Sequence, residues 1–165
     1  MAAAGTWNTQ RGERGTNLLD GGRPWYDVYE TADGQHMAVG ALEPRFYEEL
    51  LARTGLRDEA VLPERDDPRH WPDLRARLDA VFKTRTQAQW SEVFAGSDAC
   101  VSPVLSLDAA AAHPHLRARG TYAVVDGVLQ AMPAPRFSST PGAIRHAPPA
   151  PGEGGEAAMN EWGVR

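Results

Sequence analysis

Cysteine is almost missing from this sequence, because Cys100 is the only one in 165 residues. One cysteine excludes a disulfide framework within the chain and a zinc site built on a CxxC pair. A reducing compartment, the cytoplasm, fits best. Cys100 lies in the apolar run "DACVSPVLSL", which predicts a short buried strand interrupted by Pro103 at a sheet edge or bulge. We therefore expect a buried, inert thiol.

Long apolar runs and basic blocks are missing as well. No stretch approaches the roughly 18 apolar residues of a membrane span, and the first residues, "MAAAGTWNTQRGERG", lack the apolar core of a signal peptide. Lys83 is the only lysine, the net charge is -5, and no Lys/Arg-rich block is present. These features argue against a membrane partner and against nucleic-acid binding.

Two Asp-Gly dipeptides lie between β-rich runs, and each predicts a hairpin turn: Asp33-Gly34 and Asp126-Gly127. The first hairpin has β-forming residues at Trp25, Tyr26, Val28, Tyr29 and Thr31 before its turn, and at Met37 and Val39 after it. Strands and helices mix without a regular βαβ rhythm, and no internal repeat is visible. The sequence therefore predicts an α+β fold.

Apolar spacing and end signals predict the helices. Pro44 suits the first position of a helix that Gly55 ends. Thr86 and Ser106 precede two further helices as capping residues. The predicted helices cover residues 44–54, 72–85, 87–96 and 107–113, with a helical turn at 113–120 and a last helix from 155. Between Pro133 and Pro151, six of the thirteen prolines predict an extended chain.

Motifs for common catalytic and cofactor sites do not occur. The sequence has no HExxH, GxSxG, Walker loop or GxGxxG. The five histidines are His36, His70, His113, His115 and His146, and none has the spacing of a metal site. We therefore expect no metal and no nucleotide redox cofactor. The remaining candidate is Glu43, which lies between a predicted strand and a predicted helix. It is either a helix-start charge stabilised by the helix dipole or a carboxylate presented to a cleft.

Several motifs in order resemble one enzyme family. The run "RGTNLLDGGRPWYDVYETADGQHMAVGALEPRFYEELL", the stretch from "WPDLRARL" to "HPHLRARGTY", "MPAPRFSSTPG" and the tail "GEGGEAAMNEWG" are similar to the α-methylacyl-CoA racemases of CoA-transferase family III. The resemblance covers nearly all of residues 7–163. It implies the small α+β domain of that fold, with two hairpins, helices and extended connectors at both ends, and without the Rossmann-like large domain.

The resemblance also implies a division of the chain and a reaction. Residues 1–19 would be a connector from the large domain, 20–145 the small domain, and 146–165 a return segment with the start of a C-terminal helix. The implied enzyme is an isomerase of fatty acid and lipid metabolism that epimerises 2-methylacyl-CoA thioesters through an enolate. Its partners would be acyl-CoA, the large domain and, in the complete enzyme, an interlocked homodimer. This chain would be an incomplete enzyme, inactive alone.

The match "VGALEPRFY" gives Glu43 its implied role. In the racemases this glutamate lies beside a catalytic histidine of the large domain, so Glu43 is expected to orient that histidine and relay protons. No residue of the chain is assigned to CoA binding. Two alternatives stay open: a small domain of a family III CoA-transferase, which moves CoA between carboxylic acids, and a non-catalytic interaction module.

Overall fold

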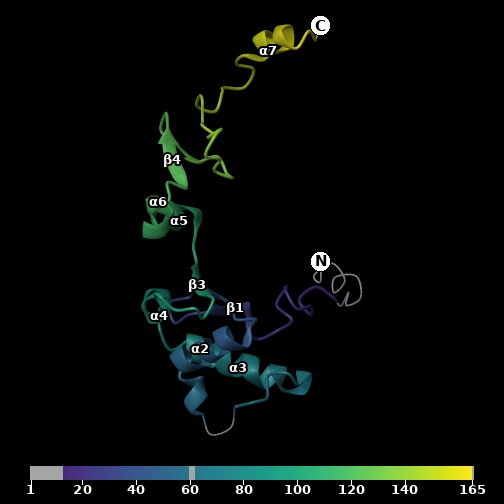
Figure 1. The fold of residues 1–165 in the computed structure, drawn as a ribbon, viewed down its shortest axis with the longest axis vertical. Helices are drawn as coiled ribbons and strands as arrows, with labels where there is room; N and C mark the ends of the chain where they lie inside the picture. Colours follow the sequence, from purple (N-terminus) through teal and green to yellow (C-terminus); the bar gives the residue numbers. More distant parts are fainter. Residues whose placement is uncertain (1–12, 60–61, 165) are drawn as a thin grey trace. The chain divides into compact units, whose positions relative to one another are not determined.

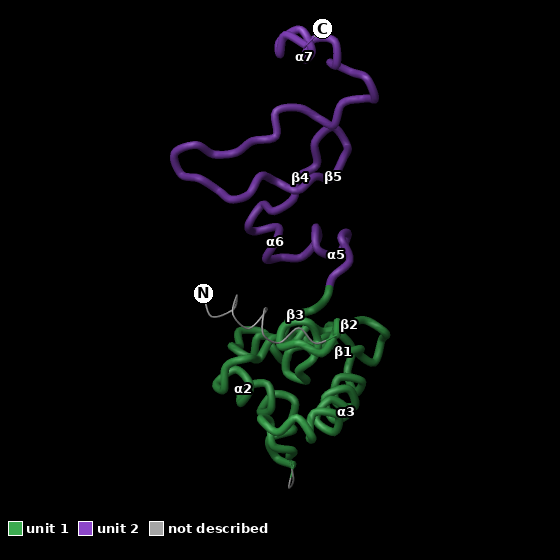
Figure 2. The backbone as a smooth tube through the Cα atoms, turned by 90° about the vertical axis from the view of Figure 1, so that its right-hand side faces the viewer, with its two compact units in different colours: residues 1–104 green, residues 105–165 purple. Residues whose placement is uncertain are grey.

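The structure is a computed structural model that describes residues 13–59 and 62–164. The first twelve residues of the predicted connector lie outside this range. The chain forms two compact units, residues 1–104 and 105–165, which Figure 2 distinguishes by colour. The division predicted at residues 19 and 145 stays a prediction, because compactness alone does not test it.

The first unit contains a three-stranded antiparallel sheet in the order β1-β2-β3. Its strands are β1 (Tyr26–Glu30), β2 (His36–Gly40) and β3 (Val101–Val104). In the register, Ala38 of β2 faces Val28 on one side and Ser102 on the other. Between β1 and β2 the turn predicted at Asp33-Gly34 is confirmed, and Gly34 has φ +73, which suits a glycine.

Helices pack on one face of this sheet (Figure 1). They are α2 (Pro44–Thr54), α3 (Trp71–Phe82) and α4 (Gln87–Phe94), with 3-10 turns at Leu56–Asp58 and Pro68–His70. Because of this packing, buried and exposed side chains alternate along the strands. Tyr29 and Met37 are buried against the helices, whereas Val28 is 50% exposed on the other face.

The helix ends follow the predicted signals. Gly55 ends α2 in the left-handed conformation at φ +80. Thr86 and Gln89 form a capping box at the start of α4. α3 begins at Trp71 and ends at Phe82, so it starts one residue before, and ends three residues before, the helix predicted over 72–85. The reason for the earlier start is local: the Asp67 side chain accepts a hydrogen bond from the Arg69 N–H, at 3.0 Å, and starts the 3-10 turn that precedes α3.

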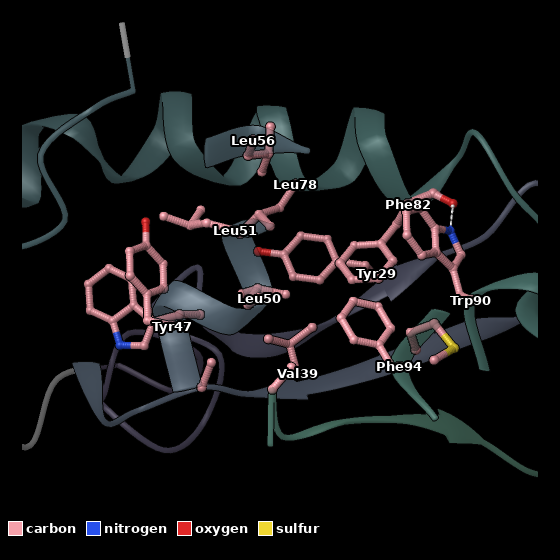
Figure 3. Close-up of a cluster of buried hydrophobic side chains, with 14 of the residues drawn as sticks. Tyr29, Val39, Tyr47, Leu50, Leu51, Leu56, Leu78, Phe82, Trp90 and Phe94 are labelled. Atoms are coloured by element: carbon pink, nitrogen blue, oxygen red, sulfur yellow. Dashed lines mark hydrogen bonds between the residues drawn. The ribbon is translucent and has the colours of Figure 1, made fainter. Parts of the chain in front are cut away.

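Phe82 is at the centre of the buried aromatic cluster in Figure 3. Its ring centroid is 5.3 Å from that of Tyr29 and 5.2 Å from that of Trp90. Phe94 lies 6.3 Å from Phe82 and contacts Trp90 as well. Such aromatic pairs add about 0.5–1.5 kcal/mol each beyond the area that they bury. The prediction that Trp90 and Phe94 belong to the core is confirmed.

Two predictions about the segment around Cys100 are wrong. β3 is an edge strand, as predicted, but its residues are half-buried or exposed because only one face of the sheet is covered. Cys100 itself is exposed. It precedes β3 and has φ +54, so the backbone turns there and Ala99 takes the buried position. The thiol is therefore accessible rather than buried.

The second unit consists of short elements: α5 (Leu107–Ala112), α6 (Pro114–Ala118), β4 (Tyr122–Val125), β5 (Val128–Ala131) and α7 (Gly155–Glu161). The predicted second hairpin is confirmed, with Asp126 and Gly127 both at positive φ, as a type I′ turn requires. Ser106 caps α5 through a hydrogen bond from the Ala109 N–H. The described residues between β5 and α7 contain no helix or strand, and none of residues 105–164 is buried. The α+β class is confirmed.

Candidate functional site

The junction between β2 and α2 is held by main-chain hydrogen bonds to two other segments. The Gly40 N–H donates to the Cys100 carbonyl oxygen at 2.8 Å, and the Ala41 N–H donates to the Trp25 carbonyl oxygen at 2.9 Å. The Leu42 N–H then donates to the Gly40 carbonyl oxygen at 2.9 Å, which turns the chain toward the helix. These bonds fix the position of the main chain at the next residue, Glu43.

Glu43 is the residue that precedes the first turn of α2. It has extended backbone angles, φ -74 and ψ 146, and its carbonyl oxygen accepts from the N–H groups of Phe46 and Tyr47, each at 3.1 Å. The side chain is exposed and makes no capping bond. Within residues 13–59 and 62–164, no hydrogen bond or ion pair occupies the Glu43 carboxylate. The carboxylate can therefore accept a hydrogen bond from a donor on another chain or domain.

The negative charge of Glu43 affects the pKa of Cys100. Partial burial raises the pKa of the Cys100 thiol, and the negative charges of Glu43 and Asp98 raise it further, while Arg45 opposes them. A thiol with a raised pKa is a poor nucleophile at neutral pH. Cys100 therefore reports on its charged neighbours and is not itself a candidate nucleophile.

An open hollow of about 460 Å³ lies on the sheet face opposite the helices. Its lining includes Tyr26, Ala38, Gly40, Cys100 and Ser102. Small side chains in the middle of the strands create the space. A Cβ added at Gly40 would meet the Cys100 carbonyl oxygen at 3.7 Å and the Tyr26 ring at 3.8 Å, which are ordinary contacts. Cys100, whose thiol pKa is raised in part by the charge of Glu43, is thus one of the residues that line the hollow.

Arg65 approaches the same junction from a loop distant in sequence. Its Nη2 donates to the Leu42 carbonyl oxygen, and its guanidinium lies over the rings of Trp25 and Tyr47, 4.3 and 4.6 Å from their centroids. Burial lowers the pKa of Arg65, and the charges of Tyr47, Asp66 and Glu43 act against that change. Sequence reasoning did not find Arg65, because it stands in a polar loop without a motif.

The histidines do not form a site. His113 precedes α6 and His115 lies inside it. Among the described residues no group of three or more His, Cys, Asp or Glu side chains could hold a metal ion. None of the helices in that part of the chain is long and apolar enough to cross a membrane. The expectation that no metal or redox nucleotide takes part stays a prediction.

The described elements define an α+β fold, and sequence comparison gives the family of the chain. The model of CoA-transferase family III matches residues 1–154, and the chain belongs to this family. It is 44% identical over 142 residues to the mouse α-methylacyl-CoA racemase and 40% identical over 141 residues to the human one. Each alignment covers 82% of this chain and 37% of the relative, so the chain spans little more than a third of the length of these relatives.

Solved structures support the fold alone. The crystal structure of the hypothetical protein Rv3272 from Mycobacterium tuberculosis has a TM-score of 0.64 to this chain at 16% sequence identity. The similarity covers 94% of this chain and 42% of that one. The fold expected from the resemblance to family III is thereby confirmed.

Proposed function

We propose that this chain contributes the Glu43 side of an α-methylacyl-CoA racemase active site. The observation that carries the proposal is the exposed Glu43 carboxylate, which has no partner among the described residues and stands at a junction fixed by β2, β3 and α2. The 44% identity to a racemase supplies the reaction class. The substrate would be a 2-methylacyl-CoA thioester.

The chemistry explains why such a carboxylate is needed. Racemisation breaks the C–H bond α to the thioester carbonyl, leaves an enolate, and returns a proton to the opposite face. Each step needs a positioned acid or base near the α-carbon. A carboxylate that accepts a hydrogen bond from a histidine holds the ring in one tautomer and makes its other nitrogen a better base. Glu43 would fill this role toward a histidine of the large domain, within an interlocked homodimer in the cytoplasm.

The test is a chimera in which residues 13–164 replace the matching segment of the mouse relative. Deuterium uptake at the α-carbon of 2-methylacyl-CoA in D₂O measures proton exchange, and chiral chromatography measures epimerisation. We expect both activities in the chimera and neither in the 165-residue chain alone. A chimera that folds, exchanges no α-proton and moves CoA between carboxylic acids would replace the racemase proposal with the transferase alternative.

A second candidate function is a non-catalytic interaction module. Among residues 105–164 none is buried, while Leu107 and Trp162 are 79% and 81% exposed. A two-stranded hairpin with so little core is at best marginally stable in water. The exposed apolar side chains of residues 105–164 therefore favour a surface that binds a partner. Sedimentation of the chain over a hundredfold concentration range tests the module: self-association supports it, and a monomer throughout argues against it.

A further inference from the structure

We propose that Arg65 is a positioning residue that fixes the direction in which Glu43 leaves the main chain. The inference rests on the proposed function, because the direction of Glu43 matters only if its carboxylate must meet a second group. Nothing in the sequence marks Arg65 for this role, since it lies 23 residues from the carbonyl group that it contacts.

The argument begins with the two peptide groups that flank the Cα atom of Glu43. The preceding peptide group carries the Leu42 carbonyl oxygen, to which Arg65 Nη2 donates. The following one carries the Glu43 carbonyl oxygen, which accepts from the N–H groups of Phe46 and Tyr47. A peptide group is planar, so anchoring its carbonyl orients the whole plane. With both planes anchored, the Cα–Cβ direction of Glu43 is set. Helix α2 supplies one anchor and Arg65 supplies the other.

Arg65 can act as an anchor because it is itself held on three sides. Its guanidinium lies over the rings of Trp25 and Tyr47, whose centroids are 5.9 Å apart in an edge-to-face arrangement. Its own carbonyl oxygen accepts a hydrogen bond from the Trp71 Nε1–H at 2.8 Å. A planar guanidinium stacks on rings and still directs an N–H sideways, which an ammonium group does less well. These contacts fix the arginine side chain independently of its hydrogen bond to the Leu42 carbonyl oxygen.

Cys100 provides a readout that requires no substrate. It is the only cysteine, it is exposed, and the Glu43 charge raises the pKa of its thiol, with Asp98 acting in the same direction and Arg45 against it. The rate of alkylation by iodoacetamide, measured against pH on the 165-residue chain, gives the apparent pKa of Cys100. The effect of Glu43→Gln on that value measures how closely the carboxylate is held to this end of the sheet.

The experiment is a double-mutant cycle of Glu43→Gln and Arg65→Met. In the parent chain, Glu43→Gln should lower the apparent pKa of Cys100 by a few tenths of a pH unit, because a nearby negative charge disfavours the thiolate. In the Arg65→Met background the same change should have less than half that effect. Arg65→Lys, which keeps a donor for the Leu42 carbonyl oxygen, should restore part of it. Arg57→Met, which removes an exposed arginine paired with Glu48 on α2, should leave the effect unchanged.

Either of two results overturns the proposal: an equal effect of Glu43→Gln with and without Arg65, or no effect in the parent chain. Circular dichroism checks that each variant is folded, and if Arg65→Met does not fold, Arg65→Lys carries the comparison. Since no acyl-CoA is involved, the cycle is independent of the chimera assay. An inactive chimera with intact Arg65 coupling would refute the racemase proposal alone, and an active chimera without coupling would refute the role of Arg65 alone.

Discussion

The indole N–H of Trp90 donates a hydrogen bond to the Phe82 carbonyl oxygen at 2.8 Å, and the two rings are in contact (Figure 3). The bond joins the last residue of α3 to the middle of α4. Phe82 and Trp90 are both buried. A carbonyl at the end of a helix has no partner inside the helix, so the indole satisfies a group that would otherwise be unpaired in the core.

Replacing Trp90 by Phe should therefore lower the free energy of unfolding by about 1–3 kcal/mol beyond the loss of packing, because the Phe82 carbonyl oxygen is left buried without a donor. Urea unfolding followed by circular dichroism measures the change. Trp162→Phe is the matched control, since Trp162 is exposed and its replacement should stay within about 0.5 kcal/mol. Equal effects of the two replacements would contradict the structural role given to the Trp90 indole.

Tyr29 and Tyr47 form a natural pair for testing a buried hydroxyl. The Tyr29 Oη donates to the Pro24 carbonyl oxygen at 2.6 Å, whereas the Tyr47 Oη has no hydrogen-bond partner among the described residues. Tyr29→Phe should cost about 1–3 kcal/mol, and Tyr47→Phe should be neutral or stabilising. Thermal or urea unfolding of the two variants compares them directly. A larger cost for Tyr47→Phe would mean that its hydroxyl has a partner after all.

The same tyrosines predict a loss of stability at alkaline pH. Burial raises the pKa of Tyr47 to about 12, with the charges of Glu48 and Asp66 adding to the effect and Arg65 opposing it. Burial also raises the pKa of Tyr29. The unfolded chain loses its phenolic protons near pH 10, before the folded chain does, so the contribution of these tyrosines to stability is constant below about pH 10 and falls as the pH rises toward about 12. The urea midpoint should decrease over this range. Tyr47→Phe should remove part of the decrease, and an unchanged pH dependence would be evidence against the assignment.

Glu43→Gln should reduce α-proton exchange in the chimera by about 10²-fold or more, since a positioned acid–base group contributes 10²–10⁴-fold to such a step. Deuterium uptake from D₂O measures the change. Glu48→Gln is the control, because Glu48 is an exposed glutamate of the same helix whose partner is Arg57, at 3.3 Å. Exchange that survives Glu43→Gln would return Glu43 to the role of a helix-start charge.

Local signals predicted most of the secondary structure. Asp33-Gly34 and Asp126-Gly127 formed the two hairpin turns, and Thr86 capped α4. These devices depend on the backbone preferences of a few consecutive residues, so they can be recognised without knowledge of the fold. The role proposed for Glu43 rests on the resemblance of "VGALEPRFY" to a family motif, because the local pattern by itself fits a simple helix start.

The exposure of Cys100 could not be anticipated in the same way. Its apolar neighbours predicted burial, but burial depends on which face of the sheet the helices cover and on the turn at φ +54 that exchanges Cys100 for Ala99. Neither the covered face of the sheet nor the backbone turn at Cys100 can be read from the residues around the cysteine.

The sequence by itself therefore determined the α+β class, the two hairpins, the caps of several helices and the membership of CoA-transferase family III. Only the tertiary structure decided that Arg65 reaches the Leu42 carbonyl oxygen beside Glu43 and that the Cys100 thiol is exposed near that carboxylate. The physical reason is the range of the interactions. Turns and caps are stabilised within one turn of chain, whereas these contacts exist only after the core around Phe82 has brought distant segments together.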